Sequence, residues 1–331
     1  MMRSFKEEKM KDIVFICDDA YALPTLVSIK SIINNAEIND CYNIHVCTFG
    51  LTPKNTELFN STDTENIKTH IHVIPKNLIE EKIKLVTQRT HVTTVALIKL
   101  ELANYFSELE QILYLDSDII VKGSLNELFK TNIKNAYLAA SFEYWIHYNN
   151  IRYISNYKHN EEFYFNSGVM LLNLKKMREN NIPDKLWDYK LNHAKTKLMD
   201  QECLNVICKN AVEPLSIKWN FNPEFLSDEH IKGINEVYHE NYKNCGQLLD
   251  EAKIIHYVGK KDKPWVYETA NLKNFWIENY NSLTGVSELR TKKYVLKKQN
   301  ILKSSAEKIK IYGISGFLHY VFYRLCKMTR R

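Results

Sequence analysis

Apolar runs and amphipathic segments alternate along the first 115 residues of the chain. Short runs rich in β-branched residues are typical of strands, and they occupy residues 12–17, 43–49, 69–73 and 111–115. Apolar residues at helical spacing lie between these runs, at residues 23–33, 53–59 and 94–105. Strands that alternate with helices predict an α/β fold with a Rossmann-like, doubly wound, mostly parallel sheet.

The second half of the chain continues this alternation less regularly. It predicts strands at residues 169–172 and 253–257 and helices at residues 184–193 and 201–208. After Trp265 the pattern is helical and increasingly basic. We therefore expect one large domain, residues 1–283, followed by a basic helical tail, residues 284–331.

The charge distribution supports this division. The 331 residues are 45% hydrophobic and 25% charged, which is typical of globular proteins and excludes disordered and fibrous classes. The formal net charge is +6, but twelve Lys and Arg side chains oppose only two Glu side chains between Glu288 and Arg331. That stretch therefore carries +10 and the rest of the chain −4.

The ends of the chain and its cysteines predict a reduced, cytosolic protein. No apolar run approaches the ~20 residues that cross a bilayer, and residues 1–12 lack the apolar core of a signal peptide. The seven cysteines are scattered, without a C-x-x-C pair or zinc-finger spacing. We therefore do not expect a disulfide framework.

Two carboxylates follow the predicted strand at residues 111–115. Asp116 and Asp118 occupy positions i and i+2 of extended chain, so their side chains point the same way and can converge on one cation. A hard divalent ion held by two carboxylates still has coordination positions that phosphate oxygens can occupy. Open α/β sheets bind ligands beyond the carboxyl ends of their strands. The alternative is a polar turn with two solvated aspartates.

The residues around this pair narrow the choice of enzyme class. Haloacid-dehalogenase-type enzymes need Gly-Thr after the second aspartate, whereas Ile119 and Ile120 follow here. Sugar nucleotidyltransferases usually carry a glycine-rich N-terminal phosphate loop, which residues 18–21 (DDAY) do not provide. Downstream, Ser124 and Glu127 have the spacing of a helix capping box.

Five motifs, in a fixed order, carry a family resemblance. They are residues 13–21 (IVFICDDAY), 116–118 (DSD), 166–173 (NSGVMLLN), 200–202 (DQE) and 256–265 (HYVGKKDKPW). Over about residues 12–265 the chain resembles glycosyltransferase family 8, retaining enzymes of GT-A fold that use a UDP-sugar and Mn²⁺. It is most similar to the bacterial lipopolysaccharide galactosyl- and glucosyltransferases.

The resemblance implies a role for each motif. It implies a site for Mn²⁺, with Mg²⁺ as the alternative ion, formed by Asp116, Asp118 and His256. It implies that UDP contacts Ile16, Cys17, Asp18, Tyr21, Ser117, Gly259 and Lys263. The residues implied for the donor sugar are Glu143, Asn166, Ser167, Asp200 and Gln201, with Asp200 and Gln201 as the catalytic pair.

Elementary chemistry is consistent with these roles. An aromatic face such as Tyr21 suits a planar base, and the Asp18 carboxylate can accept the uracil N–H. A neutral imidazole at His256 completes an oxygen and nitrogen site that Mn²⁺ accepts, and Lys263 can offset diphosphate charge. Taken alone, Asp18 and Asp200 would pass as helix caps and His256 as a structural histidine.

Three features depart from the family pattern. Leu97 stands where relatives carry an arginine that contacts the donor, and Glu143 where they carry an aspartate. The spacing from His256 to Lys263 is one residue longer than usual, so Lys261 is a competing phosphate ligand. The cations that could replace the arginine are Arg89, His91 and Lys99.

The residue types favour a front-face substitution over a double displacement. A double displacement needs a carboxylate close under the anomeric carbon. By analogy Gln201 takes that place, and an amide is a poor nucleophile. We therefore expect an oxocarbenium-like transition state in which the departing phosphate helps accept the acceptor's proton, while Asp200 and Gln201 position and stabilise.

The tail interleaves cations with aromatic residues between residues 308 and 327. This interfacial amphipathic pattern suits an anionic membrane surface, and a helix that packs on the body is the alternative. No recognised nucleic-acid-binding module precedes the tail, so we expect no nucleic-acid partner. The predicted location is the cytoplasm, with peripheral attachment to the inner face of the cell membrane.

The leading hypothesis is therefore a UDP-hexose-dependent transferase that moves galactose or glucose to a saccharide acceptor. The expected acceptor is a lipid-linked lipopolysaccharide, a lipooligosaccharide or another cell-surface glycan. Two alternatives stay open. One is an enzyme of the same fold that glycosylates a surface adhesin, and the other is a degenerate member that binds UDP-sugar or membrane without turnover.

Overall fold

The structure is a computed structural model, and it describes only part of the chain. The described residues are 10–75, 82, 94–148, 153–154, 157–158, 163–193, 199–259 and 261–291. The predictions for the tail beyond residue 291, and for Arg89 and His91, lie outside the described residues.

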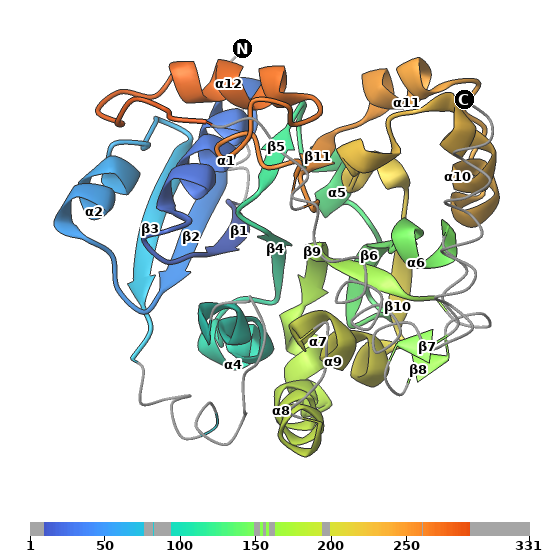
Figure 1. Ribbon diagram of the computed structural model, residues 1–331. Helices are drawn as coiled ribbons and strands as arrows, with labels where there is room; N and C mark the ends of the chain where they lie inside the picture. Colours follow the sequence, from blue (N-terminus) through green and yellow to red (C-terminus); the bar gives the residue numbers. More distant parts are fainter. Residues whose placement is uncertain are drawn as a thin grey trace, which may run out of the picture.

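A seven-stranded sheet forms the centre of the described structure (Figure 1). Six strands run parallel, and β9 runs antiparallel to its neighbours β4 and β6. In spatial order the strands are β10 (Val212–Leu215), β6 (Leu138–Phe142), β9 (Phe165–Asn173), β4 (Gln111–Leu115), β1 (Lys11–Ile16), β2 (Tyr42–Thr48) and β3 (Ile67–Val73). This mixed, mostly parallel sheet confirms the predicted fold class.

The two faces of the sheet are buried against different helices, because side chains alternate along each strand. In β1, Ile13 and Phe15 pack with helices α1 (Ala22–Asn35) and α2 (Pro53–Asn60). Val14 and Ile16 pack on the opposite face. The elements that cover this second face are the 3₁₀ helix η1 (Thr94–Glu101) and helices α4 (Leu102–Tyr105), α7 (Leu174–Glu179), α8 (Ile182–Asn192) and α9 (Met199–Cys208).

A two-stranded antiparallel ribbon lies beside the sheet and is essential for the site. It pairs β5 (Ile119–Val121) with β11 (Ile254–His256), and the register places His256 opposite Ile119. Because Ile119 directly follows Asp118, the ribbon brings the end of β11 to the aspartate pair. A second ribbon pairs β7 (Tyr153–Ile154) with β8 (Tyr157–Lys158).

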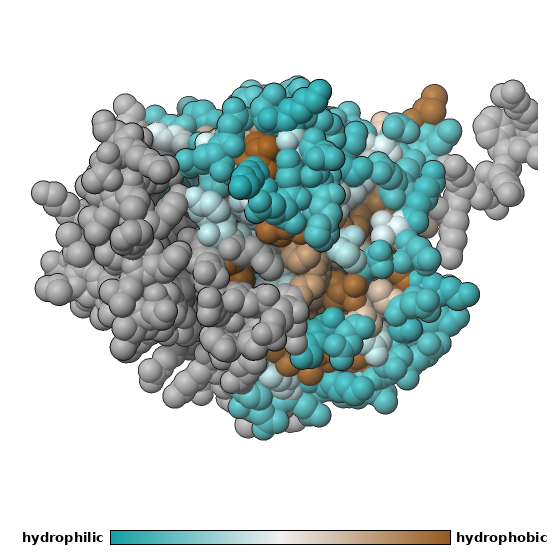
Figure 2. All heavy atoms as spheres, turned by 90° about the vertical axis from the view of Figure 1, so that its right-hand side faces the viewer, coloured by the Kyte–Doolittle hydropathy of each residue, from teal (hydrophilic) through white to brown (hydrophobic). Residues whose placement is uncertain are grey.

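Short helices pack around a third apolar cluster on the side of β6 and β11. These helices are α6 (Tyr144–Tyr148), η2 (Ile217–Trp219), η3 (Pro223–Phe225), η4 (Asp228–His230), α10 (Ile231–Tyr238), α11 (Cys245–Glu251) and α12 (Lys273–Asn281). Helix α5 (Asn126–Phe129) packs instead in the cluster that holds Ile13 and Phe15. On this side of the molecule, apolar atoms gather in the middle of the face with hydrophilic atoms above and below (Figure 2). Among the described residues, no helix is long and apolar enough to cross a membrane.

Most predicted elements are confirmed, and two predictions need correction. Residues 94–101 form a 3₁₀ helix rather than an α-helix, so that Leu97 and Leu100, three residues apart, are both buried. The strand predicted at residues 253–257 is present as β11, and it pairs with β5 in the small ribbon. The division at residue 283 stays a prediction.

The second correction concerns the capping box, which is wrong. Helix α5 starts after Leu125 without a side-chain cap. Ser124 instead donates to Asp40, with 3.3 Å between oxygens, and its hydroxyl accepts the N–H of Asn126. Glu127 turns away and pairs with Lys218, 2.8 Å from its ammonium nitrogen. A long-range ion pair therefore replaces the local contact that the spacing suggested.

Candidate active site

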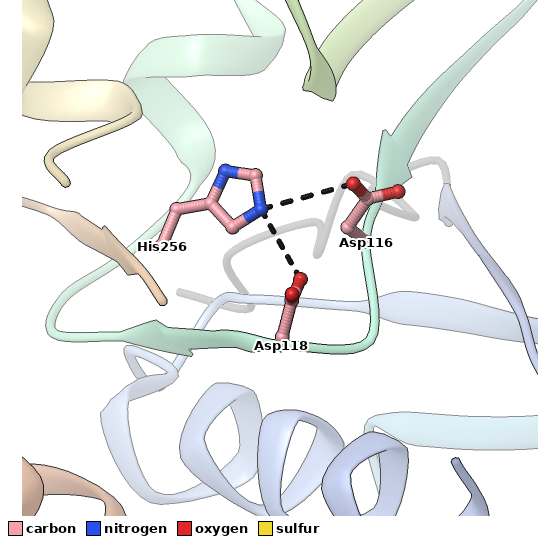
Figure 3. A group of neighbouring side chains, drawn as sticks. All are labelled: Asp116, Asp118 and His256. Carbon is pink, nitrogen blue, oxygen red and sulfur yellow. Dashed lines mark hydrogen bonds and ion pairs between the residues drawn. The ribbon is translucent and has the colours of Figure 1, made fainter. Parts of the chain in front are cut away.

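Asp116, Asp118 and His256 converge at the end of β4, as Figure 3 shows. Nε2 of His256 lies 3.1 Å from Oδ1 of Asp118 and 3.7 Å from Oδ2 of Asp116. One ligand atom from each of the three residues lies within 4.8 Å of the others. Two carboxylate oxygens and one imidazole nitrogen form a donor set that suits Mn²⁺ or Mg²⁺. The predicted metal ligands are therefore brought together.

Gly168 in β9 makes this convergence possible. A Cβ at this position would lie 2.2 Å from Cε1 of His256 and 2.8 Å from Oδ2 of Asp116. The carbonyl of Gly168 also accepts the N–H of Asp116 at 2.7 Å. The backbone of β9 therefore forms the floor on which two of the three candidate metal ligands rest, and any side chain there would displace them.

Lys263 reaches this centre despite the longer spacing from His256. Its ammonium contacts the Asp118 carboxylate and the backbone carbonyl of Tyr257. The segment between His256 and Lys263, which is one residue longer than usual, contains a turn in which the N–H of Asp262 donates to the carbonyl of Gly259 at 3.0 Å. Lys261 is exposed, so of these two lysines it is Lys263 that reaches the aspartate pair. Burial alone would raise the pKa of Asp118, but Lys263 and His256 hold it well below its usual range.

Lys99 supplies a buried cation on the other side of the aspartate pair. Its nitrogen lies 2.7 Å from Oδ2 of Asp200 and 3.4 Å from Oδ1 of Asp116. Burial alone would lower the pKa of Lys99, but the two carboxylates outweigh it and raise the pKa. Leu97 is fully buried in the core beneath. Of the three cations considered as replacements for the family arginine, Lys99 is the one that lies among the described residues, and it contacts the site.

The residues implied for the donor sugar form one connected group. Oγ of Ser167 donates to Asp200 at 3.2 Å, and the N–H of Ser167 donates to Oε1 of Gln201 at 3.0 Å. Both Asn166 and Gln201 donate to Oε2 of Glu143, at 2.7 and 3.4 Å. Burial raises the pKa of Glu143, and the two amide donors oppose this shift. Asp200 does not serve as a simple helix cap, because its carboxylate faces Lys99 and Ser167.

At the nucleotide end, Asp18 and Tyr21 lie in the loop between β1 and α1. Oδ1 of Asp18 accepts the N–H groups of Ala20 and Tyr21, at 3.1 and 3.2 Å. Asp18 therefore stabilises the turn before α1 but is not its helix cap, because the N-cap residue is Tyr21 and makes no side-chain cap hydrogen bond. The Tyr21 ring is 38% exposed and meets the Trp265 ring edge-on, with 6.2 Å between centroids. The exposed Tyr21 and its neighbour Trp265 therefore lie beside the candidate metal ligands.

The other residues implied for UDP have side chains that are buried or absent. Ile16 and Cys17 are buried, and burial raises the pKa of the Cys17 thiol to about 12, so this thiol is not a reactive one. Ser117 is buried and its hydroxyl donates to the carbonyl of Ile16 at 3.1 Å. Gly259 has no room for a Cβ, which would lie 2.4 Å from Oδ2 of Asp262.

Two residues at the site were not predicted from the sequence. The Tyr114 hydroxyl donates to Oδ1 of Asp116 at 2.6 Å, and the Tyr114 ring lies under the Lys99 ammonium, 4.4 Å from its centroid. Asn220 contacts both Asn166 and His256. The available signals were weak: a tyrosine two residues before Asp116, and an asparagine between the aromatic residues Trp219 and Phe221.

Comparison with known proteins identifies the family. The family described as "Glycosyl transferase family 8" matches residues 12–269. The chain is 30% identical over 254 residues to a lipopolysaccharide 1,2-glucosyltransferase of Escherichia coli, covering 75% of this chain and 71% of that protein. It is 27% identical over 272 residues to glycosyltransferase GlyF of Streptococcus pneumoniae, covering 80% of this chain and 60% of that protein.

Solved structures show the same fold. The galactosyltransferase LgtC, in complex with donor and acceptor sugar analogues, superposes with a TM-score of 0.66 and 26% identity. The superposition covers 84% of this chain and 98% of LgtC. The chain spans less than two thirds of the length of GlyF, so the whole activity of such longer relatives does not carry over by similarity alone.

Proposed function

The chain belongs to glycosyltransferase family 8, and we propose that it is a retaining hexosyltransferase that uses a UDP-sugar and Mn²⁺. We propose galactose or glucose as the transferred sugar and a lipopolysaccharide, a lipooligosaccharide or another cell-surface glycan as the acceptor. The observation that carries this proposal is the convergence of three candidate metal ligands with Lys99, Lys263 and the pair of Asp200 and Gln201.

Asp116, Asp118 and His256 would hold the cation. When bound, Mn²⁺ supplies positive charge to the diphosphate as it becomes the leaving group. Without such a cation the end of β4 presents two carboxylates to an anionic substrate, and these would repel it. Lys263 now contacts Asp118 and is placed to exchange that carboxylate for a phosphate oxygen when the nucleotide binds.

The nucleotide would lie between Tyr21 and the backbone of the loop that holds Ser117. Tyr21 offers an exposed ring for stacking on uracil, and Asp18 offers its carboxylate to the uracil N–H. The backbone at Ile16 and Cys17 closes the edge of this site. Gly259 lets the chain approach the diphosphate next to Lys263.

The contacts of Asp200 favour front-face substitution. Lys99 at 2.7 Å and the Ser167 hydroxyl at 3.2 Å both contact Oδ2 of Asp200, and the neighbouring ammonium reduces the nucleophilicity of the carboxylate. Gln201 is an amide, held by the N–H of Ser167. These two residues would orient the sugar and stabilise positive charge that develops at its anomeric carbon, rather than form a covalent bond to it.

A panel of UDP-sugars tests the proposal. We expect Mn²⁺-dependent release of UDP from UDP-galactose or UDP-glucose, and NMR of the released sugar should show the configuration of the donor. Release of the opposite anomer would contradict retention. Binding of UDP-sugar without release of UDP would indicate the degenerate alternative. The preferred sugar in the panel would identify the donor.

The tail would bring this site to its acceptor. We propose that residues 287–331 attach the protein peripherally to the anionic inner face of the cell membrane, at about 1 kcal/mol per basic residue near the surface. The full chain should co-sediment with anionic liposomes, and a chain ending at residue 286 should not, although it should still release UDP. Equal liposome binding of the two chains would contradict this role.

A further inference from the structure

His256 makes a second hydrogen bond on the side of its ring that faces away from Asp116 and Asp118. Its Nδ1 lies 2.8 Å from Oδ1 of Asn220. The two residues are almost completely buried, with 3% and 7% of their surface exposed. None of the five sequence motifs includes Asn220. A buried hydrogen bond to a candidate metal ligand determines the orientation of its ring and which of its ring nitrogens carries the hydrogen.

A backbone donor fixes the direction of the hydrogen bonds that lead to Asn220. The N–H of Gly168 donates to Oδ1 of Asn166 at 2.9 Å, and a backbone nitrogen can only donate. The amide oxygen of Asn166 therefore faces Gly168. Nδ2 of Asn220 lies 3.0 Å from the same oxygen. Because two amide oxygens would repel each other there, Asn220 must turn its nitrogen to Asn166 and its oxygen to His256.

The other end of the chain of hydrogen bonds confirms this direction. Nδ2 of Asn166 lies 2.7 Å from Oε2 of Glu143, a carboxylate oxygen that accepts. Hydrogen-bond donation therefore runs one way, from His256 through Asn220 and Asn166 to Glu143. Each amide donates with its nitrogen and accepts with its oxygen, so every member of the chain is satisfied.

The orientation of Asn220 determines which nitrogen of the His256 imidazole carries the hydrogen. Because Asn220 presents an oxygen, Nδ1 of His256 must carry a hydrogen. The nitrogen that lies 3.1 Å from Asp118 and 3.7 Å from Asp116 is then Nε2. In the neutral ring, Nε2 has its lone pair free and directed at the position between the two carboxylates, as a metal ligand requires.

Backbone contacts hold the two partners in register. The N–H of Phe221 donates to the carbonyl of Ile254 at 3.0 Å, and the N–H of His256 donates to the carbonyl of Phe221 at 2.8 Å. Asn220 directly precedes Phe221, so these bonds set its side chain beside the imidazole. The contact is therefore part of the fold of β11 and not a surface interaction.

We propose that Asn220 is a positioning residue, which keeps the hydrogen of His256 on Nδ1 and so presents Nε2 to the divalent cation. Its effect on metal binding rests on the proposed metal function, whereas its hydrogen bond to His256 does not. Removal of such a supporting partner typically lowers metal affinity about 10- to 100-fold. Asn220 would touch neither the cation nor the substrate.

Three variants of the full chain separate positioning from packing. Asn220→Leu removes the acceptor for Nδ1–H, and Asn220→Asp keeps an oxygen there while losing the donor to Asn166. Asn279→Leu is the matched control, because Asn279 in α12 is also buried but donates to Phe275, away from the site. The readouts are ¹H–¹⁵N NMR of the His256 ring without metal, and Mn²⁺ titration followed by EPR.

The proposal predicts a split between these variants. The wild type and Asn220→Asp should show a hydrogen-bearing Nδ1 and similar affinity for Mn²⁺, although Asn220→Asp should be less stable because a carboxylate oxygen then faces Oδ1 of Asn166. Asn220→Leu should lose the Nδ1–H signal and bind Mn²⁺ about 10- to 100-fold more weakly. Asn279→Leu should lose stability alone. A wild-type His256 whose Nδ1 carries no hydrogen would overturn the proposal even if Asn220→Leu does not fold.

The two proposals can fail separately. If the wild type shows the Nδ1–H signal and Asn220→Leu loses it, but neither protein binds Mn²⁺, then the metal function fails and the positioning role remains. If Asn220→Leu binds Mn²⁺ as tightly as the wild type and keeps the Nδ1–H signal, the positioning role is excluded.

Discussion

The nucleotide end and the metal centre of the site are held in place in different ways. At the nucleotide end, Asp18 is fixed by the N–H groups of residues two and three positions further along the chain. At the metal centre, Asp118 meets His256 across 138 positions of sequence, through the pairing of β5 with β11. Local contacts therefore set the first region, and the tertiary fold sets the second. Substitutions at the metal centre should therefore have larger effects than substitutions at the nucleotide end.

The largest effect on Mn²⁺ binding should come from a methyl group added at Gly168, where β9 contacts the metal ligands. Gly168→Ala places a Cβ against His256 and Asp116, within 2.2 and 2.8 Å of their atoms. Overpacking of this kind costs about 1–3 kcal/mol of stability, and displacement of two ligands should abolish Mn²⁺ binding. Calorimetric titration with Mn²⁺ and urea unfolding measure the two effects.

Gly123→Ala is the matched control for this variant. A Cβ at Gly123 would meet only the flexible side chain of Lys253, at 3.4 Å. We expect it to bind Mn²⁺ like the wild type. If Gly168→Ala also kept normal Mn²⁺ binding, the metal centre would not depend on the close approach of β9, and the contrast with the nucleotide end would weaken.

A second test removes the buried cation of the metal centre. Lys99→Met leaves Asp116 and Asp200 without their shared ammonium, which lies 3.4 and 2.7 Å away. We expect UDP release to fall by about 100-fold, because a positioned charge is lost next to the reacting groups. Lys99→Arg should recover part of the rate. Steady-state kinetics of both variants would show whether Lys99 stands in for the missing arginine.

At the nucleotide end, Tyr21 allows a milder test. Tyr21→Ala should weaken UDP-sugar binding by about 1–3 kcal/mol, as expected for loss of one ring stacked on a base. Tyr21→Phe should bind like the wild type, because the ring is kept. KM for the UDP-sugar is the measurement, with kcat as the control. An unchanged KM in Tyr21→Ala would mean that the ring only packs on Trp265.

Variants of Asp18 distinguish a structural role in the turn before α1 from a ligand role. Asp18→Asn keeps an oxygen for the N–H groups of Ala20 and Tyr21, so stability should be unchanged, whereas Asp18→Ala loses both hydrogen bonds and about 1 kcal/mol. If the carboxylate also binds uracil, both variants should raise KM for the UDP-sugar. Loss of stability in Asp18→Ala with normal KM in both variants would leave the turn as its only role.

A test away from both regions concerns the pH dependence of stability. His72 in β3 lies 2.9 Å from Nδ1 of His45 and 3.4 Å from the Tyr105 hydroxyl. Burial lowers the pKa of His72 to about 4, from an ordinary value near 6.5. Because the folded state disfavours the charged form, its contribution to stability is complete above pH 6.5 and is lost as the pH falls towards 4.

Urea unfolding at pH 7.5, 5.5 and 4.5 tests this dependence. The wild type should lose stability across this interval, and His72→Gln should lose less, because no buried imidazole has to be charged. Equal slopes in the two proteins would show that other groups control the dependence.

The same contrast explains what the sequence could predict. Strands and the i, i+2 arrangement of Asp116 and Asp118 follow from local periodicity, so they were predicted well. The burial of Lys99 depends on the 3₁₀ conformation of η1, and the direction of β9 depends on its pairing with β4 and β6. Such features follow from contacts between distant segments, which periodicity does not describe.

Single residues show where local reasoning failed. Ser124 and Glu127 had the spacing of a capping box, but Asp40 and Lys218 compete for them across the fold. Asn220 belongs to none of the sequence motifs, because its partners Asn166 and His256 lie 54 and 36 positions away in the chain. The family resemblance supplied the roles of Asn166 and Gln201, which no local pattern distinguishes from ordinary polar residues.

The most direct test of the account is the rate of UDP release with Mn²⁺ in Asp118→Asn and in a matched surface variant, Asp63→Asn. Asp63 is exposed and lies in the segment between α2 and β3, where it pairs with Lys68 and accepts the N–H of Thr69 at 2.8 Å. We predict a loss of about 100-fold or more in Asp118→Asn, together with loss of Mn²⁺ binding, and no change in Asp63→Asn. A fully active Asp118→Asn protein would contradict the assignment of Asp116, Asp118 and His256 as the catalytic metal centre.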